Sequence, residues 1–238
     1  DSFFATEEDN SSPDSRDKAA GLAKCLLDHD RDRSEEAIEQ YVKEPFLKQV
    51  DEVLQYICNG FIYETRKGRD AVKAGSRLEY TEEGRAEIFE SAVKLIYRCL
   101  FLFYAEARRL FPTKPEQAEL YRSLSMQALC REAHKFHWGQ RRDHEQYDLW
   151  KHLKGLIDAV NNGDPEYGIM GYDGGLFDDE EEVFLGQHQL RNDFLSRALY
   201  LLAFVKPSDN EPDNEYPIPY EDLEVRHLGE LYENILEY

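Results

Sequence analysis

Apolar residues recur at every third or fourth position along most of this chain, which is the spacing of one face of an α-helix. Residues that favour helix ends separate these stretches: Ser34 and Thr81 suit N-caps, Pro45 and Pro115 suit first turns, and Gly163 suits a C-terminus. The pattern predicts helices over residues 18–28, 34–43, 45–61, 81–112, 115–138, 145–163, 185–204 and 221–238.

The helix that should end at Pro112 differs from the others because it is apolar nearly all round between Leu95 and Ala105. A helix with no polar face is buried on every side. Patterns that alternate apolar and polar residues, as strands do, are scarce. We therefore expect a mainly α fold, an irregular multi-helix bundle with a central buried helix and few or no strands.

The distribution of polar residues and prolines predicts four segments. Residues 1–17 form a polar lead-in, residues 18–205 a helical domain, residues 206–220 a linker with four prolines, and residues 221–238 a terminal helix. The apolar residues of the terminal helix fall on one face, which predicts a docking surface: Leu228, Leu231, Tyr232, Ile235 and Leu236. Because the first residue is Asp rather than Met, we expect the sequence to be a piece of a longer chain.

Charge limits the partners of the isolated chain. Its 29 Lys and Arg against 49 Asp and Glu give a formal charge of −20, which repels a phosphate backbone. A second interpretation of the acidic composition is adaptation to high salt. Two local clusters reverse this bias and are candidate DNA-backbone contacts: Arg66, Lys67 and Arg69, and Arg131, Lys135, Arg141 and Arg142. The alternative is that these cations pair with neighbouring acids.

The most apolar stretch, residues 92–107, contains Lys94, Arg98 and Glu106 and is shorter than the ~20 residues that span a membrane. The first residues are acidic, unlike a secretory leader. We therefore expect a soluble cytoplasmic protein whose four cysteines, none in a C-x-x-C pair, are buried and reduced.

Candidate chemistry is sparse. His134 and His137 could begin a metal site with Asp143 and His144, but the spacing favours a surface histidine pair. The glycines between Gly168 and Gly175 lack a preceding strand, which favours a turn over a phosphate-binding loop. We assign no catalytic, cofactor-binding or metal-binding residue.

Three stretches, taken in order, resemble a known family: YRCLFLFYAEARRLFP (residues 97–112), GYDGGLFDDEEEVFL (171–185) and VRHLGELYENILEY (225–238). They are similar to the segments that precede the methyltransferase domain of type IIG restriction-modification enzymes, often named type II restriction enzyme methylase subunits. Asp173 stands where the family usually has Asn. The residues that carry the second and third resemblances are Tyr172, Asp173, Gly174, Gly175, Leu176 and Phe177, and Leu228, Gly229, Leu231, Tyr232, Ile235 and Leu236.

The resemblance implies a function for the parent protein. In such enzymes a helical spacer joins an N-terminal nuclease, which needs Mg²⁺, to an adenine-N6 DNA methyltransferase that uses S-adenosylmethionine. The cofactor loop and the Asn-Pro-Pro-Tyr motif should follow Tyr238, and the nuclease motif should lie upstream. The chain is then a non-catalytic spacer whose partners are its own nuclease and methyltransferase domains, and DNA through the parent. Its terminal helix docks on the methyltransferase domain.

Two alternatives stay open. A phage-defence methyltransferase of the BREX or type ISP kind has a similar architecture, and flanking genes would separate it from the first hypothesis. A free-standing acidic adaptor would bind a protein through the face from Leu228 to Leu236. A stop codon directly after Tyr238 would favour the adaptor.

Overall fold

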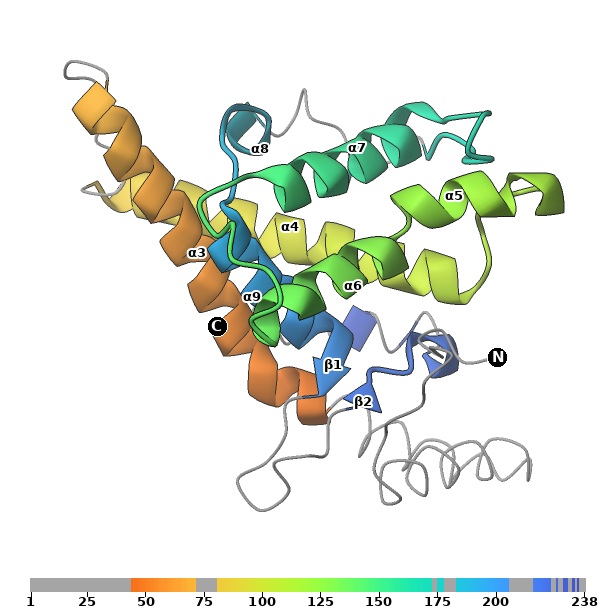
Figure 1. The fold of residues 1–238 in the computed structure, drawn as a ribbon. Helices are drawn as coiled ribbons and strands as arrows, with labels where there is room; N and C mark the ends of the chain where they lie inside the picture. Colours follow the sequence, from red (N-terminus) through yellow and green to blue (C-terminus); the bar gives the residue numbers. More distant parts are fainter. Residues whose placement is uncertain are drawn as a thin grey trace. The chain divides into compact units, whose positions relative to one another are not determined.

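The computed structural model describes residues 44–71, 81–172, 175–177, 183–205 and 216–223, and further single residues, which are Arg226, Gly229, Glu230, Glu233 and Ile235 (Figure 1). The helices predicted over residues 18–28 and 34–43 and the lead-in at 1–17 lie outside the described residues. Residues 206–215 of the predicted proline linker also lie outside them.

The described part of the chain is mainly α-helical, as predicted. Its only sheet is one antiparallel pair of two-residue strands, in which Phe204 pairs with Pro217 and Val205 with Tyr216. None of the described helices is long and apolar enough to cross a membrane. The elements are α3 (Glu44–Ala71), α4 (Glu82–Ala107), η3 (Pro115–Gln117), α5 (Ala118–Leu124), α6 (Met126–His137), α7 (Asp148–Asn162), α8 (Val183–Gln187), α9 (Asn192–Ala203), β1 (Phe204–Val205), β2 (Tyr216–Pro217) and η4 (Tyr220–Asp222).

Contacts divide the chain into two units, residues 1–51 with 201–238 (unit 1) and residues 52–200 (unit 2). In unit 1, three polar groups satisfy backbone carbonyls at the C-terminus of α9, which lack partners within the helix. The Gln49 amide donates to Leu201 O at 2.8 Å, the Tyr220 hydroxyl donates to Leu202 O at 2.7 Å, and Ile218 N donates to Ala203 O at 2.9 Å.

Helix α4 is the central buried helix of unit 2, as its apolar sequence predicts. It begins where the sequence indicates, because the Thr81 hydroxyl accepts a hydrogen bond from Gly84 N at 2.9 Å. Glu82 and Glu83 in its first turn complement the positive end of the helix dipole. Helix α4 contacts α6 and α8, while α6 also packs against α5 and α7.

The end of α4 differs from the prediction, because the helix stops at Ala107 and not at Pro112. Arg109 N donates to Glu106 O and Leu110 N donates to Ala105 O, each at 2.9 Å. These two bonds, with Arg109 in the left-handed region at a φ of 56°, form a Schellman motif. Glycine is the usual residue at such a position, since a side chain there costs about 1–2 kcal/mol.

Three other predicted boundaries were wrong. Helix α3 continues past Phe61 to Ala71, because the single Gly68 costs only about 1 kcal/mol of helix propensity among good helix formers. The helix predicted over residues 115–138 breaks at Ser125, whose hydroxyl caps α6 by accepting from Ala128 N and also donates to Arg122 O. The helix predicted over 185–204 is split into α8 and α9 before Asn192.

A glycine allows a close approach within unit 2. A methyl group at Gly60 of α3 would lie 2.6 Å from Leu190 Cδ2 and 3.0 Å from Phe194 Cβ. We expect Gly60→Ala to destabilise the fold by about 1–2 kcal/mol, because the steric cost exceeds the gain in helix propensity. Gly155→Ala in α7 is the matched control, since its nearest neighbour is Leu124 Cδ1 at 4.0 Å. It should stabilise by up to about 1 kcal/mol in urea unfolding, and equal gains for both variants would contradict the close approach.

The left-handed conformation of Arg109 in the Schellman motif leads to a second prediction, on stability. Arg109→Gly removes the strain of a left-handed arginine, whereas Arg109→Ala removes the same charge but keeps the strain. We expect the glycine variant to be more stable than the alanine variant by about 1 kcal/mol in urea unfolding. Its gain over the wild type should be smaller, because a cation at a helix C-terminus contributes about 0.3–1 kcal/mol. An alanine variant as stable as the glycine variant would contradict the left-handed conformation.

Candidate functional site

The glycine-rich turn of the second resemblance is fixed to the central helix. Arg98 of α4 is only 1% exposed, and its Nε donates to the carbonyl of Leu176 at 2.7 Å. The adjacent Phe177 ring is fully buried and lies 6.0 Å from the Arg98 guanidinium. A buried guanidinium needs hydrogen-bond partners to offset its lost hydration, and this carbonyl is one of them.

Aromatic contacts reinforce the same junction. The Phe101 ring of α4 lies 5.1 Å from Phe177 and 4.7 Å from Tyr172, measured between ring centroids. Aromatic pairs of this kind stabilise a fold by more than the burial of their apolar area alone. The first and second family-like stretches therefore pack together, although 78 residues separate Arg98 from Leu176. Gly175, Leu176 and Phe177 form a turn, as predicted, while Asp173 and Gly174 lie outside the described residues.

A buried carboxyl group lies further along α4. Glu106 is 8% exposed and accepts hydrogen bonds from the Tyr121 hydroxyl at 2.5 Å, from Met126 N at 2.6 Å and from Gln127 N at 3.3 Å. Its carboxyl group thereby caps the N-terminus of α6 and binds α5 through Tyr121. Burial raises the pKa of Glu106 to about 7, although the three hydrogen bonds and the charge of Arg131 act to lower it.

The described cysteines lie near this carboxyl group or in the core. Cys99 of α4 and Cys130 of α6 are free, fully buried thiols, in agreement with the prediction of buried reduced cysteines. Burial raises the pKa of Cys99 to about 12 and raises that of Cys130 well above its ordinary value. Cys58 is free and half-buried, and Cys25 lies outside the described residues.

Two of the four predicted DNA-backbone contacts whose side chains the structure describes are paired with acids. Lys135 pairs with Glu132 at 2.6 Å. Arg141 pairs with Glu132 at 3.2 Å, with Asp148 at 2.8 Å and with Asp143. The alternative stated for these cations, pairing with neighbouring acids, therefore holds for these two. Arg131 and Arg142 are exposed, while Arg66, Lys67 and Arg69 lie on α3 with side chains outside the described part of the structure.

The Arg141 pairs belong to a network that the sequence analysis missed. Asn192 is fully buried at the start of α9; its Nδ2 donates to Asp143 O at 3.0 Å and to an Asp148 carboxylate oxygen at 2.5 Å. Its Oδ1 accepts from Leu149 N at 3.2 Å. Burial acts to raise the pKa of Asp148, but the bonds from Asn192 and Arg141 lower it. No sequence signal distinguishes this Asn from the other polar residues of the chain.

The histidines singled out in the sequence are engaged by aromatic neighbours. The Trp138 indole N–H donates to His134 Nε2 at 3.0 Å, and the His137 ring is stacked on Tyr200 with 3.7 Å between ring centroids. Among the described residues, no group of three or more His, Cys, Asp or Glu side chains is placed to hold a metal ion. Both histidines are half-buried, whereas the sequence favoured a surface pair.

The third family-like stretch is described at only a few positions. Gly229 is exposed and Ile235 is fully buried by the chain itself. The docking face predicted for the terminal helix is therefore already covered at Ile235. Leu228, Leu231, Tyr232 and Leu236 lie outside the described residues. A docking role for the rest of this face stays a prediction.

Comparisons with family models, with curated proteins and with solved structures found no match for this chain. The resemblance to type IIG enzymes therefore rests on the three sequence stretches.

The buried Glu106 makes the stability of the fold depend on pH. Its pKa is 4.5 in an ordinary setting and about 7 here, so the folded state holds this proton more tightly than the unfolded chain. The associated stability is present in full below pH 4.5 and is lost as the pH rises through 7. Between about pH 5 and 8 the free energy of unfolding should fall by about 2.5 kcal/mol from this group.

Urea unfolding across this range measures the effect, with Glu106→Gln as the control, because glutamine does not titrate. The carboxyl groups of Asp143 and Asp148 do not titrate in this pH range, because their pKa values are lowered and affect stability only at lower pH. Glu106→Gln is expected to lose the extra slope, because it stays neutral and pays no cost for a buried charge as the pH rises. Equal slopes for the two proteins would show that Glu106 is not buried as described.

Proposed function

We propose that this chain is the helical connector of a type IIG-like restriction-modification enzyme. It has no catalytic role of its own and holds the nuclease and methyltransferase domains of the parent protein in register on DNA. The parent uses S-adenosylmethionine for adenine-N6 methylation and Mg²⁺ for cleavage. The protein then acts in the cytoplasm, where these reactions take place.

The observation that carries the proposal is the contact between the first two family-like stretches. The Arg98–Leu176 bond and the Phe101–Phe177 contact join residues that the resemblance selects from distant parts of the sequence. Residues of one motif set that pack together form one structural element, and a connector must be rigid to fix the spacing of the domains at its ends. Glu106, also within the first stretch, fixes α5 and α6 to the same helix.

The third stretch supplies the link to the methyltransferase domain. Leu228, Leu231, Tyr232 and Leu236 fall on one face of the terminal helix in the sequence pattern. Ile235, on the same predicted face, is fully buried by this chain and anchors the helix to the connector. In this proposal the remaining apolar positions contact the methyltransferase domain.

The coding sequence after Tyr238 tests the proposal first. We expect about 300 further residues, a length suited to a methyltransferase domain, with a glycine-rich loop followed by Asn-Pro-Pro-Tyr. The longer protein should transfer a labelled methyl group from S-adenosylmethionine to adenine in duplex DNA. Replacement of the Asn of Asn-Pro-Pro-Tyr by Ala is the control and should abolish transfer.

A stop codon directly after Tyr238 would contradict the proposal and favour a free-standing adaptor. Intact downstream motifs without methyl transfer would contradict it as well. The gene could instead lie among phage-defence genes of the BREX or type ISP kind and its product transfer the methyl group. That result would keep the connector role and change the class of the parent enzyme.

A further inference from the structure

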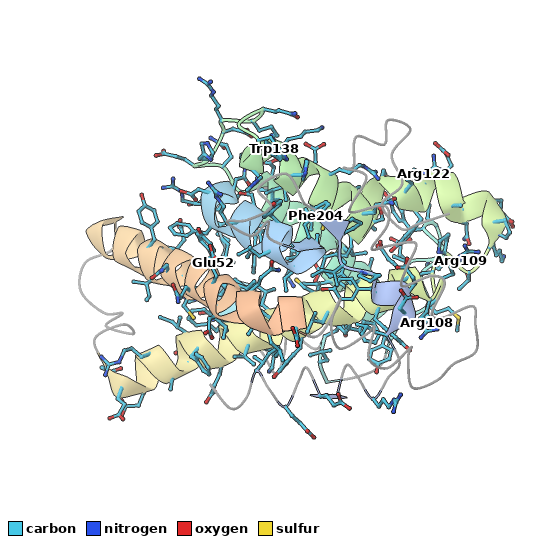
Figure 2. The ribbon with its side chains drawn as sticks, turned by 90° about the horizontal axis from the view of Figure 1, so that it is seen from below. Glu52, Arg108, Arg109, Arg122, Trp138 and Phe204 are labelled. Carbon is cyan, nitrogen blue, oxygen red and sulfur yellow. The ribbon has the colours of Figure 1, made fainter. Side chains whose placement is uncertain are left out.

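A basic turn follows the central helix on an otherwise acidic protein. We define the arginine turn as residues 108–110, in which Arg108, Arg109 and Leu110 are all exposed. Figure 2 shows Arg108 and Arg109 at the end of α4, with Arg122 of α5 at the same end of the unit 2 helices. The chain as a whole carries a formal charge of −20. A local excess of cations on such a protein is a candidate site for an anionic partner.

Hydrogen bonds and packing explain why Arg122 lies at this end. The hydroxyl of Tyr121, the residue before Arg122, donates to the Glu106 carboxyl at 2.5 Å, in the last turn of α4. The Tyr121 ring also lies 5.5 Å from the ring of Phe111, measured between centroids. These contacts fix α5 against the C-terminal end of α4. Arg122 pairs with Glu119 at 3.1 Å, and both side chains are mostly exposed.

Arg109 occupies its position at a conformational cost. Its φ of 56° is the left-handed conformation that glycine adopts without strain. The charge of Arg109 near the negative end of the helix offsets part of this cost, and Arg108 already provides a cation there from an ordinary φ of −82°. Residues kept in strained conformations are concentrated at functional sites. The strained Arg109 is therefore a candidate for a binding role.

The surroundings of Arg109 contrast with those of Arg141. Arg141 has three carboxylates as partners, from Glu132, Asp143 and Asp148. Among the described residues, Arg109 forms no ion pair. A guanidinium presents its N–H groups in a planar fork that fits two oxygens of a phosphate or carboxylate. Arg109 is thus available for an external oxyanion.

We propose that the arginine turn binds the phosphate backbone of duplex DNA, with Arg109 as the main contact and with Arg122 as an additional cation. The choice of DNA over other polyanions rests on the proposed function. The acidic remainder of the chain repels a duplex, so the turn also orients the DNA toward the end of α4. This site is separate from the cation clusters that the sequence singled out at residues 66–69 and 131–142.

Fluorescence anisotropy tests the proposal. It measures the binding of the full chain to a fluorescein-labelled random duplex of about 24 base pairs. Measurements at about 50 and about 200 mM KCl give the salt dependence. Arg109→Gly and Arg109→Ala should each weaken binding roughly 3- to 10-fold at the lower salt and reduce the slope of log K against log salt by about one. The glycine variant guards against a folding defect, because it relieves strain.

Arg85→Ala is the matched control. Arg85 is also exposed but lies in the first turn of α4, roughly 35 Å from the arginine turn along the helix axis. It removes the same charge and should leave binding unchanged. Wild-type affinity in Arg109→Gly, or an equal loss in Arg85→Ala, would overturn the proposal.

Two further outcomes would also overturn it. If the wild-type chain shows no binding at about 50 mM KCl, the inference fails, whereas methyl transfer by the longer protein would still decide the proposed function separately. If sedimentation instead shows salt-sensitive self-association that Arg109→Gly removes, the oxyanion belongs to an acidic surface of a second copy and not to DNA.

Discussion

Two ionisable side chains buried on the central helix constrain the arrangement of unit 2. Arg98 and Glu106 are both nearly inaccessible on α4, and an unpaired charge in such a place costs several kcal/mol. The helix can occupy the centre only when the carbonyl of Leu176 lies against Arg98 and when Tyr121 and the N-terminus of α6 lie against Glu106. Apolar packing alone would allow α4 many neighbours, whereas these polar partners select particular ones.

The same constraint connects the fold to the proposed role. A connector that fixes the distance between two domains needs elements that cannot slide, and hydrogen bonds to buried charges provide them. The Asn192 network does the equivalent for the loop before α7 and the start of α9. Ion pairs of Arg141 with Glu132 of α6, with Asp148 of α7 and with Asp143 neutralise one of the cations that the sequence alone presents as a basic patch.

The sequence predicted features that depend on local chemistry. The central position of α4, its N-cap at Thr81 and the stop at Gly163 follow from apolar periodicity and capping residues, which act within a few positions. It failed where distant partners decide. The split before Asn192 and the roles of Arg98 and Glu106 depend on groups far along the chain, and a charged residue in an apolar helix does not indicate its partner. Ion pairing of Lys135 and Arg141 with acids was predicted as the alternative to contact with DNA, and the structure confirms it for these two cations.

The two fully buried thiols give the molecule an internal reporter of motion. Cys99 and Cys130 lie on α4 and α6, and burial raises the pKa of both. Only the thiolate attacks an alkylating reagent at a useful rate, so neither sulfur reacts until the helices separate and admit solvent. The half-buried Cys58 lies outside that contact, so its reaction rate does not depend on the separation of α4 and α6. Labelling rates of Cys99 and Cys130 therefore report the opening of the α4–α6 contact, with Cys58 of α3 as an internal comparison.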